Sequence, residues 1–253
     1  MILALPELAT VFVLVFARVG TLVMLLPGVG ERLIPGRLRL AFALLLTLTL
    51  LPLARVLLPA ATAPERVFGV LFGEILVGLV LGLATRIVIG ALQTAGTIIA
   101  QELGLSFAMT IDPSQGGGQE AAIGNLLTLL GIALVFATDT HHIAITAIRD
   151  SYALLPPTGG PPEAGDAARL AVGAVGRAFA LAVKISAPFI AFAFLFNLGL
   201  GILSRLMPQV QVFFLGIPLS ILIGMLVLAA VVGAMMAAFV QDLGRFMTGF
   251  GSI

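Results

Sequence analysis

Long runs of apolar residues, most of them about as long as a membrane-spanning helix, fill most of this chain of 253 residues. A helix needs roughly 20 mostly apolar residues to cross a bilayer. The runs are Leu8–Leu26, Leu38–Leu58, Val67–Leu92, Ala122–Ala137, Val172–Leu200 and Val210–Val240. The fourth run is short for a span, and the last two are long enough to bend or to continue beyond a membrane. Since no strand pattern competes with these runs, the sequence predicts an all-α membrane protein with about six long apolar helices.

Charged residues are too scarce to cover an ordinary soluble surface. They make up 10% of the chain, whereas a soluble domain has about 25%. Most of the surface must therefore face lipid or other apolar protein. The formal net charge of +1 gives no sign of a nucleic-acid partner, and without cysteine the chain has neither disulfides nor thiolate metal ligands. With no Trp and one Tyr, the aromatic belt expected of a protein alone in a bilayer is nearly missing.

A segment rich in proline and glycine divides the chain. The stretch 156–166 reads PPTGGPPEAGD and predicts a linker after a short helix over Ile143–Leu155. We therefore expect a larger first part over 1–157, and a second part with two apolar segments over 158–253. Two residues of this second part, Pro188 and Pro218, are expected kink points, because each removes a backbone hydrogen-bond donor inside an apolar run.

The positive charges of the short loops do not set an orientation. If six helices alternate across a bilayer, the loops on the side of the N-terminus hold six Lys or Arg, against about five on the other side. This tie suggests that helices alternating across a bilayer do not describe the assembled form of the chain.

Of the charged residues inside the apolar runs, we single out four: Arg18, Glu74, Arg86 and Lys184. An ionisable group at membrane depth costs about 2.5–3.5 kcal/mol on insertion scales, so it normally faces the interior of a bundle, a partner or water. One interpretation is a proton or substrate relay, which would need several acids at similar depth. Only Glu74 fits that pattern, so we favour charge pairing between helices or between subunits.

Glycines recur in the third run as two pairs, and the two members of each pair lie on one helix face. Gly69 and Gly73 are four residues apart, as are Gly78 and Gly82. Because glycines at this spacing let a neighbouring backbone approach closely, they predict tight helix packing, within the chain or with another chain.

No catalytic motif or metal-site pattern stands out. The sequence lacks the nucleotide-binding GxxxxGK[ST], the zinc-binding HExxH and the nucleophile motif GxSxG. The two histidines, His141 and His142, follow Asp139 at the start of a helix, where adjacent side chains point about 100° apart. We therefore expect no enzyme activity, no cofactor and no tight metal site, and a helix-start or hydrogen-bonding role for these histidines.

One irregular stretch, residues 101–120, contrasts with the apolar runs around it. Asp112 and Pro113 disfavour helix, and Gly116, Gly117 and Gly118 follow. Irregular backbone between membrane helices must be buried in protein or line a polar cavity. This stretch is therefore the expected place for a gate.

Several strings, in this order, resemble the FliR family of flagellar type III export-gate proteins. They are GLSFAMTIDP at 104–113, the histidine pair at 141–142, SYALLP at 151–156 and NLGLGILSRLMPQVQVFFLGIP at 197–218. The resemblance covers nearly the whole chain and extends more distantly to counterparts in virulence secretion. The second part also resembles FliQ-type chains through KISAP at 184–188 and MPQVQV at 207–212. The first part then corresponds to a FliP-type chain.

This resemblance implies a core subunit of a protein-conducting channel in the bacterial inner membrane, within the flagellar basal body. The implied partners are FliP-type and FliQ-type subunits, an FlhB-type switch protein, rod proteins and unfolded flagellar proteins in transit. The second part would form a kinked helical hairpin that turns near Leu206–Gln211. A pore plug would occupy 106–118, with contacts from Phe107, Met109 and Ile111, a bend at Asp112 and Pro113, and a hinge at Gly116, Gly117 and Gly118.

A small-solute secondary transporter is the alternative from a different class. It would have inverted repeats and a site at the membrane midplane between broken helices, and the two unequal parts of this chain argue against it. The equivalent subunit of a virulence type III secretion system is the alternative within the same family. The choice of flagellar export rests on the resemblance.

Overall fold

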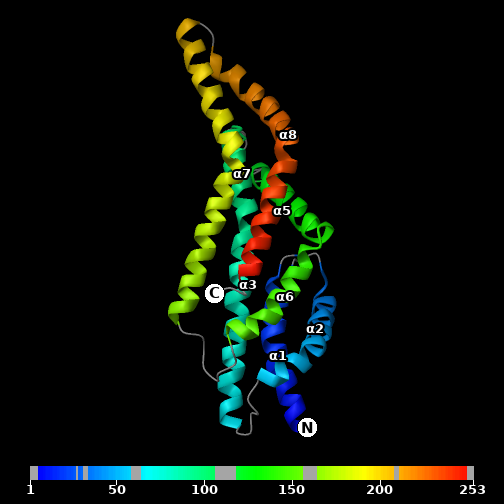
Figure 1. The fold of residues 1–253 in the computed structure, drawn as a ribbon. Coiled ribbons are helices and arrows are strands. Elements are labelled where there is room, and N and C mark those ends of the chain that lie inside the picture. Colours follow the sequence, from blue (N-terminus) through cyan, green and yellow to red (C-terminus); the bar gives the residue numbers. More distant parts are fainter. Residues whose placement is uncertain are drawn as a thin grey trace. The chain divides into compact units, whose positions relative to one another are not determined.

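The computed structural model describes residues 5–26, 28–30, 34–57, 64–105, 118–155, 164–207 and 211–249. Within these ranges every element of regular structure is helical, which confirms the predicted all-α class (Figure 1). In chain order the helices are α1 (Leu5–Leu25), α2 (Gly36–Leu57), α3 (Pro64–Glu102), α5 (Gly118–Ala137), α6 (Thr140–Leu154), α7 (Ala164–Leu206) and α8 (Val212–Thr248).

Three helices extend well beyond the apolar runs that predicted them. α3 has 39 residues, α7 has 43 and α8 has 37. At 1.5 Å per residue these helices are about 58, 64 and 55 Å long, so each exceeds the roughly 30 Å hydrocarbon core of a bilayer. The predicted bounds are too short because alanine, glutamine and other good helix formers continue the helices where the apolar pattern weakens.

Among the described residues, four segments are long and apolar enough to cross a membrane: Glu7–Leu25, Val67–Glu102, Gly165–Leu206 and Phe214–Thr248. A fifth would be Ala122–Ala137 joined to Thr140–Tyr152, although the chain bends by 78° between them. Asp139 lies at this bend with a φ of 56°, in the left-handed region. The short helix expected after the fourth run is α6.

The chain forms two compact units. One comprises Met1–Val88, Val135–Arg177 and Leu243–Ile253, and the other Ile89–Leu134 and Ala178–Asp242. The three long helices contribute residues to both units. The units therefore differ from the two sequence parts, 1–157 and 158–253, because helices of this length have more residues than one compact core can cover.

In the first unit, α1 packs along α2. The buried side chains of α1 include Leu14, Val15, Val19 and Val23. α6 adds the buried Ile148 and Tyr152 to this core. In the second unit, the largest fully buried side chains are Leu92, Ile99, Leu103, Leu127, Ile185, Phe189 and Phe239.

Both α7 and α8 also carry large apolar side chains that are exposed. Phe179, Phe194, Leu195, Leu206, Phe214, Leu215, Leu222 and Leu226 are 61% exposed or more. Apolar surface of this kind marks contact with lipid or with protein partners. The helices continue through Pro188 in α7 and Pro218 in α8.

Candidate functional site

The predicted plug loop is described only at its two ends. Phe107, Met109, Ile111, Asp112, Pro113, Gly116 and Gly117 lie outside the described residues. Gly118, expected as a hinge residue, is the first residue of α5. The structure thus describes the helix end from which the loop starts and the helix end to which it returns, both in the second unit.

The first of these ends, the C-terminus of α3, has the hydrogen bonds of a Schellman cap. The backbone N–H of Gly104 donates to the carbonyl of Gln101, and that of Leu105 donates to the carbonyl of Ala100, both at 3.0 Å. Gly104 has a φ of 77°, which glycine adopts without the steric cost of a Cβ atom. The chain therefore leaves α3 in a defined direction where the loop begins.

Residues of α8 hold this end in place. The side chain of Leu103 is fully buried and lies against Gly224, where any added Cβ atom would overlap with it. The hydroxyl of Ser220 lies 3.1 Å from the carbonyl oxygen of Leu103 and 2.8 Å from that of Ile217, so it can donate to either. Ser220 thus offers a donor to a carbonyl that the end of α3 leaves without an intrahelical partner.

Removing this hydroxyl should loosen the start of the loop. We expect Ser220→Ala to lower the free energy of unfolding by about 0.5–1.5 kcal/mol, the net value of one hydrogen bond. Amide hydrogen exchange at Leu103 to Leu105 should become faster in detergent micelles. The matched control is Ser204→Ala, because that hydroxyl is exposed and bonds the carbonyl of Gly201 within its own helix. Equal exchange rates in the two variants would contradict the anchoring role of Ser220.

The other end of the loop, at the N-terminus of α5, depends on a close backbone approach to α3. A Cβ atom at Gly96 would overlap with backbone atoms of Gly124. A Cβ atom at Gly124 would lie 2.6 Å from Nε2 of Gln93. Since only glycine leaves this space empty, the two residues set the distance between α3 and α5. Both ends of the loop are therefore fixed by packing within one unit.

An open groove of about 400 Å³ lies beside the end of α3. Its lining residues are Glu102, Ile190, Ala193, Phe194, Asn197 and Leu198. The amide of Asn197 already donates to the carbonyl of Ala193 at 2.8 Å. The groove is therefore mostly apolar, with the Glu102 carboxylate as its charged group.

A buried ion pair lies in the first unit, between α1 and α3. Nε of Arg18 is 2.7 Å from Oε2 of Glu74, and the Nη2 atom is 3.0 Å from Oε1. Both side chains are almost fully buried, with exposures of 1% and 2%. This fork-to-carboxylate geometry with two parallel bonds is the strong form of the ion pair.

The same guanidinium also binds the C-terminal end of α6. Nη1 of Arg18 donates to the carbonyl of Ser151 at 2.9 Å, and Nη2 donates to the carbonyl of Leu155 at 2.8 Å. The ring of Tyr152 lies 4.1 Å from the guanidinium carbon. α6 has no basic residue in its own last turn, so a cation from α1 complements its dipole and donates to its terminal carbonyls. The carbonyl of Ser151 also accepts from the backbone N–H of Leu155 at 2.9 Å.

Two of the predicted packing glycines bring α1 and α3 together beside this ion pair. A Cβ atom at Gly78 would overlap with the hydroxyl of Thr21 and would lie 2.7 Å from the carbonyl of Arg18. A Cβ atom at Gly82 would lie 2.7 Å from Cβ of Leu25. On the same helix Gly73 is buried and Gly69 is exposed.

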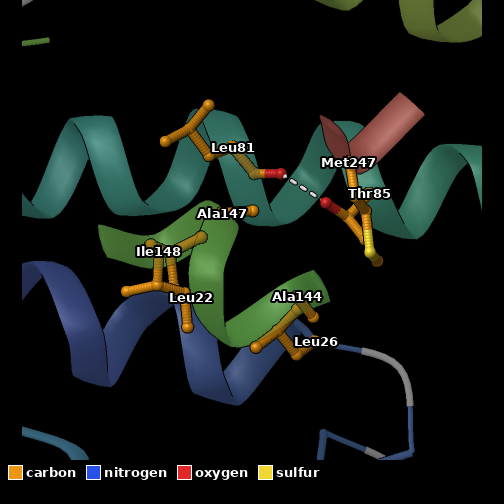
Figure 2. A pocket seen from close by; sticks show the side chains of 8 residues that line it. All are labelled: Leu22, Leu26, Leu81, Thr85, Ala144, Ala147, Ile148 and Met247. Carbon is orange, nitrogen blue, oxygen red and sulfur yellow. Dashed lines mark hydrogen bonds between the residues drawn. The ribbon is translucent and has the colours of Figure 1, made fainter. Parts of the chain in front are cut away.

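A small apolar cavity lies where α1, α3 and α6 meet in the first unit. Figure 2 shows its lining, which comprises Leu22, Leu26, Leu81, Thr85, Ala144, Ala147, Ile148 and Met247. The hydroxyl of Thr85 donates to the carbonyl of Leu81 at 3.0 Å. The cavity volume is about 10 Å³, close to the minimum for one water molecule. This space is a packing gap and does not fit a solute.

The other two charges of the apolar runs, Arg86 and Lys184, are exposed. Among the residues that the structure describes, neither forms an ion pair or a side-chain hydrogen bond. The four charges singled out in the sequence therefore separate into one buried pair within the chain and two cations on its surface.

Asp139, His141 and His142 lie together at the start of α6. The two imidazole rings do not diverge as expected, because their centroids are 4.1 Å apart. One ligand atom from each of the three residues lies within 4.8 Å of the others, and these donor types suit a divalent cation. However, Asp139 and His142 are exposed and contact each other at 3.6 Å, and the ring of His141 packs at 5.3 Å from Phe136.

Sequence reasoning assigned no contact to Ser151, Tyr152, Ser220 or Gly124. Ser151 and Tyr152 entered only as part of the string at 151–156. Gly96 follows the paired glycines of the third run without their four-residue spacing, so its close approach to Gly124 was not predicted. Only the tertiary contacts distinguish these residues from their neighbours.

A family model described as "Bacterial export proteins, family 1" matches residues 9–246. The chain is 44% identical to the flagellar biosynthetic protein FliR of Caulobacter vibrioides, over 85% of this chain and 86% of that protein. It is 32% identical to the protein of the same name from Bacillus subtilis, over 88% and 86% of the two chains. A match of 28% identity to the Yop proteins translocation protein T of Yersinia pestis covers 61% of this chain and 59% of that protein.

Proposed function

This chain belongs to family 1 of the bacterial export proteins, as a FliR-type member, and on that premise we propose that it is a channel-forming subunit of the flagellar export gate. In this role it assembles in the inner membrane, at the flagellar basal body, with FliP-type and FliQ-type subunits. An FlhB-type switch protein and rod proteins adjoin the complex, and unfolded flagellar proteins pass through it. The chain itself catalyses no reaction.

The observation that carries this proposal is the packing at the two ends of the segment 106–117. One end is capped by Gly104 and contacts Ser220, and the other depends on the approach of Gly124 to Gly96. Twelve residues can span at most roughly 40 Å, so a segment of this length, fixed at both ends, can close a pore and be displaced from it. We propose that its apolar residues Phe107, Met109 and Ile111 form the plug, with the bend at Asp112-Pro113.

The relatives favour flagellar over virulence export. The flagellar proteins named above are 44% and 32% identical to this chain over at least 85% of its length, whereas the virulence protein is 28% identical over 61%. The two unequal parts of the chain argue against a small-solute transporter built from inverted repeats, and the apolar cavity of the first unit, at about 10 Å³, is too small for a solute.

Removing the plug contacts should make the closed complex leak. Phe107→Gly, or deletion of Gly116 to Gly118, should raise the passive ion conductance of membranes that hold the complete gate, because the segment no longer fills the pore. The measurement is ion efflux from such vesicles, with secretion of flagellar proteins assayed in parallel. Ser204→Ala, on the exposed surface of α7, is the control. If both leak and secretion match the unaltered protein, the plug assignment is wrong.

Gentle purification of the tagged chain tests the assembly itself. A gate subunit should copurify with two different small membrane proteins in fixed ratio, whereas a solute transporter should be purified alone or as a homo-oligomer. Recovery of the chain without other membrane subunits would contradict the proposed function.

A further inference from the structure

Arg86 is a cation at membrane depth that the described part of the chain leaves without a counter-charge. It lies in the candidate span Val67–Glu102. A stretch of roughly 20 residues is long enough to cross a bilayer. Within this span, the earliest such stretch is 67–86 and the latest is 83–102. Every possible stretch therefore contains Arg86. The side chain is exposed, and a charge in contact with hydrocarbon is costly unless it pairs or reaches water.

The contrast with Arg18 shows what Arg86 lacks. Arg18 also lies in a candidate span, Glu7–Leu25, and there Glu74 and two backbone carbonyls satisfy its guanidinium. No carboxylate of the described residues plays this part for Arg86. Within the described residues, Arg86 therefore has no counter-charge, and we look for one on a partner chain.

Arg86 is part of an outward stripe on α3 within the first unit, formed by Leu79, Leu83 and Arg86. These residues are four and three positions apart, so they share one face of the helix. Leu79 and Leu83 are 39% and 42% exposed. The stripe thus offers two apolar contacts and a cation to a neighbouring helix.

The surroundings of this stripe fit protein better than lipid. Two exposed leucines stand on the same helix face as Arg86, which suits a helix lying along α3. A lipid headgroup would meet Arg86 only if the membrane segment ended at it, as the stretch 67–86 does. The chain also lacks Trp, and Tyr152 is buried against Arg18, so aromatic anchors for a lipid interface are missing from the described helices.

We propose that this stripe is the docking face for an apolar helix of another export-gate subunit, which places an Asp or Glu carboxylate against Arg86. This inference rests on the proposed function, because it assumes a multi-subunit gate. It assigns a partner of defined chemistry to one face of α3.

The partner helix can be identified by crosslinking in the assembled gate. A photoreactive benzoyl-phenylalanine at position 83, in cells that assemble the complete complex, should form an adduct with a membrane helix of a second subunit. Mass spectrometry of the adduct should place an Asp or Glu within about one helical turn of the crosslinked residue, which is the reach of neighbouring side chains. Adducts with lipid alone, or with a helix that lacks an acid at this level, would overturn the proposal.

Charge substitution then tests the pairing. Arg86→Lys should keep most of the copurifying subunits and most of the secretion. Arg86→Met should lower both at least tenfold although the amount of the chain in the membrane is unchanged, and Arg86→Glu should be at least as severe. Exchanging the crosslinked acid for Lys should restore secretion in the Arg86→Glu background.

The matched control is Arg169→Met. That arginine is also exposed, but it lies in the polar first turns of α7, 3.8 Å from Asp166, so its removal should change neither assembly nor secretion. If Arg86→Met behaves like this control, the docking inference fails. The proposed function then still stands provided that deleting the whole gene abolishes flagellar secretion, and it fails separately if the deletion has no effect.

Discussion

Arg18→Met, with Glu74 left in place, should destabilise the first unit by about 3–5 kcal/mol, the usual cost of leaving one partner of a buried ion pair unpaired. The carboxylate of Glu74 is 2% exposed, so water cannot replace the two bonds that it loses. Glu74→Leu should have a similar effect, because it leaves the guanidinium without its counter-charge. The measurement is the free energy of unfolding in detergent, from denaturant titration followed by circular dichroism.

The double variant Arg18→Met/Glu74→Leu should recover most of this loss. Two apolar side chains of similar volume remove both charges together, which is often neutral or stabilising in a core. If the double variant is as unstable as either single variant, the two residues do not act as a pair.

The double variant also separates two effects of Arg18: its ion pair with Glu74 and its hydrogen bonds to the end of α6. It restores an uncharged core but leaves the carbonyls of Ser151 and Leu155 without the donors that Arg18 supplies. The end of α6 should therefore open more often even where the overall stability is recovered. Since the chain has no cysteine, Leu155→Cys gives a single thiol whose rate of maleimide labelling reports this opening.

We expect labelling at position 155 to be about tenfold faster in the double variant, which corresponds to about 1.4 kcal/mol and matches the loss of one or two hydrogen bonds. The control is a cysteine at Thr146, an exposed residue of the same helix, whose labelling should not change. Equal rates at position 155 in the presence and absence of Arg18 would show that Arg18 does not hold the end of α6.

Gly96→Leu should have the second large effect, because no side chain fits between α3 and α5. The atoms in the way belong to the backbone of Gly124, so they cannot move aside as a flexible side chain would. We expect a loss of at least about 3 kcal/mol, the upper end for overpacking, and loss of secretion because the end of the loop is displaced. Even Gly96→Ala should be destabilising at this position.

Gly233→Ala is the matched control in the same unit. A Cβ atom at Gly233 would have nothing within 4 Å, so this helical glycine should tolerate alanine and gain about 0.5–1 kcal/mol from the reduced backbone entropy of the unfolded chain. The measurement is the thermal stability of Gly96→Ala and Gly233→Ala in the same detergent. A Gly96→Ala variant as stable as Gly233→Ala would mean that the close approach of α3 to α5 is not required.

The charged residues illustrate how far sequence reasoning reaches. Each of Arg18, Glu74, Arg86 and Lys184 interrupts an apolar run, and the energetic cost of such a charge marks all four as needing a partner or water. The pattern is the same for a residue that faces a neighbouring helix and one that faces outward. Which charges meet depends on how each helix is rotated, and the apolar runs alone do not determine that rotation.

The sequence by itself determined the helical class, the approximate position of each apolar helix and the interruption at 101–120, because apolar run length and proline or glycine content act locally. The tertiary structure decided what holds the ends of that interruption. Ser220 lies 117 residues from Leu103, and Glu74 lies 56 residues from Arg18. Contacts of this kind follow from helix packing, in which shape and burial select partners that no local pattern of the chain indicates.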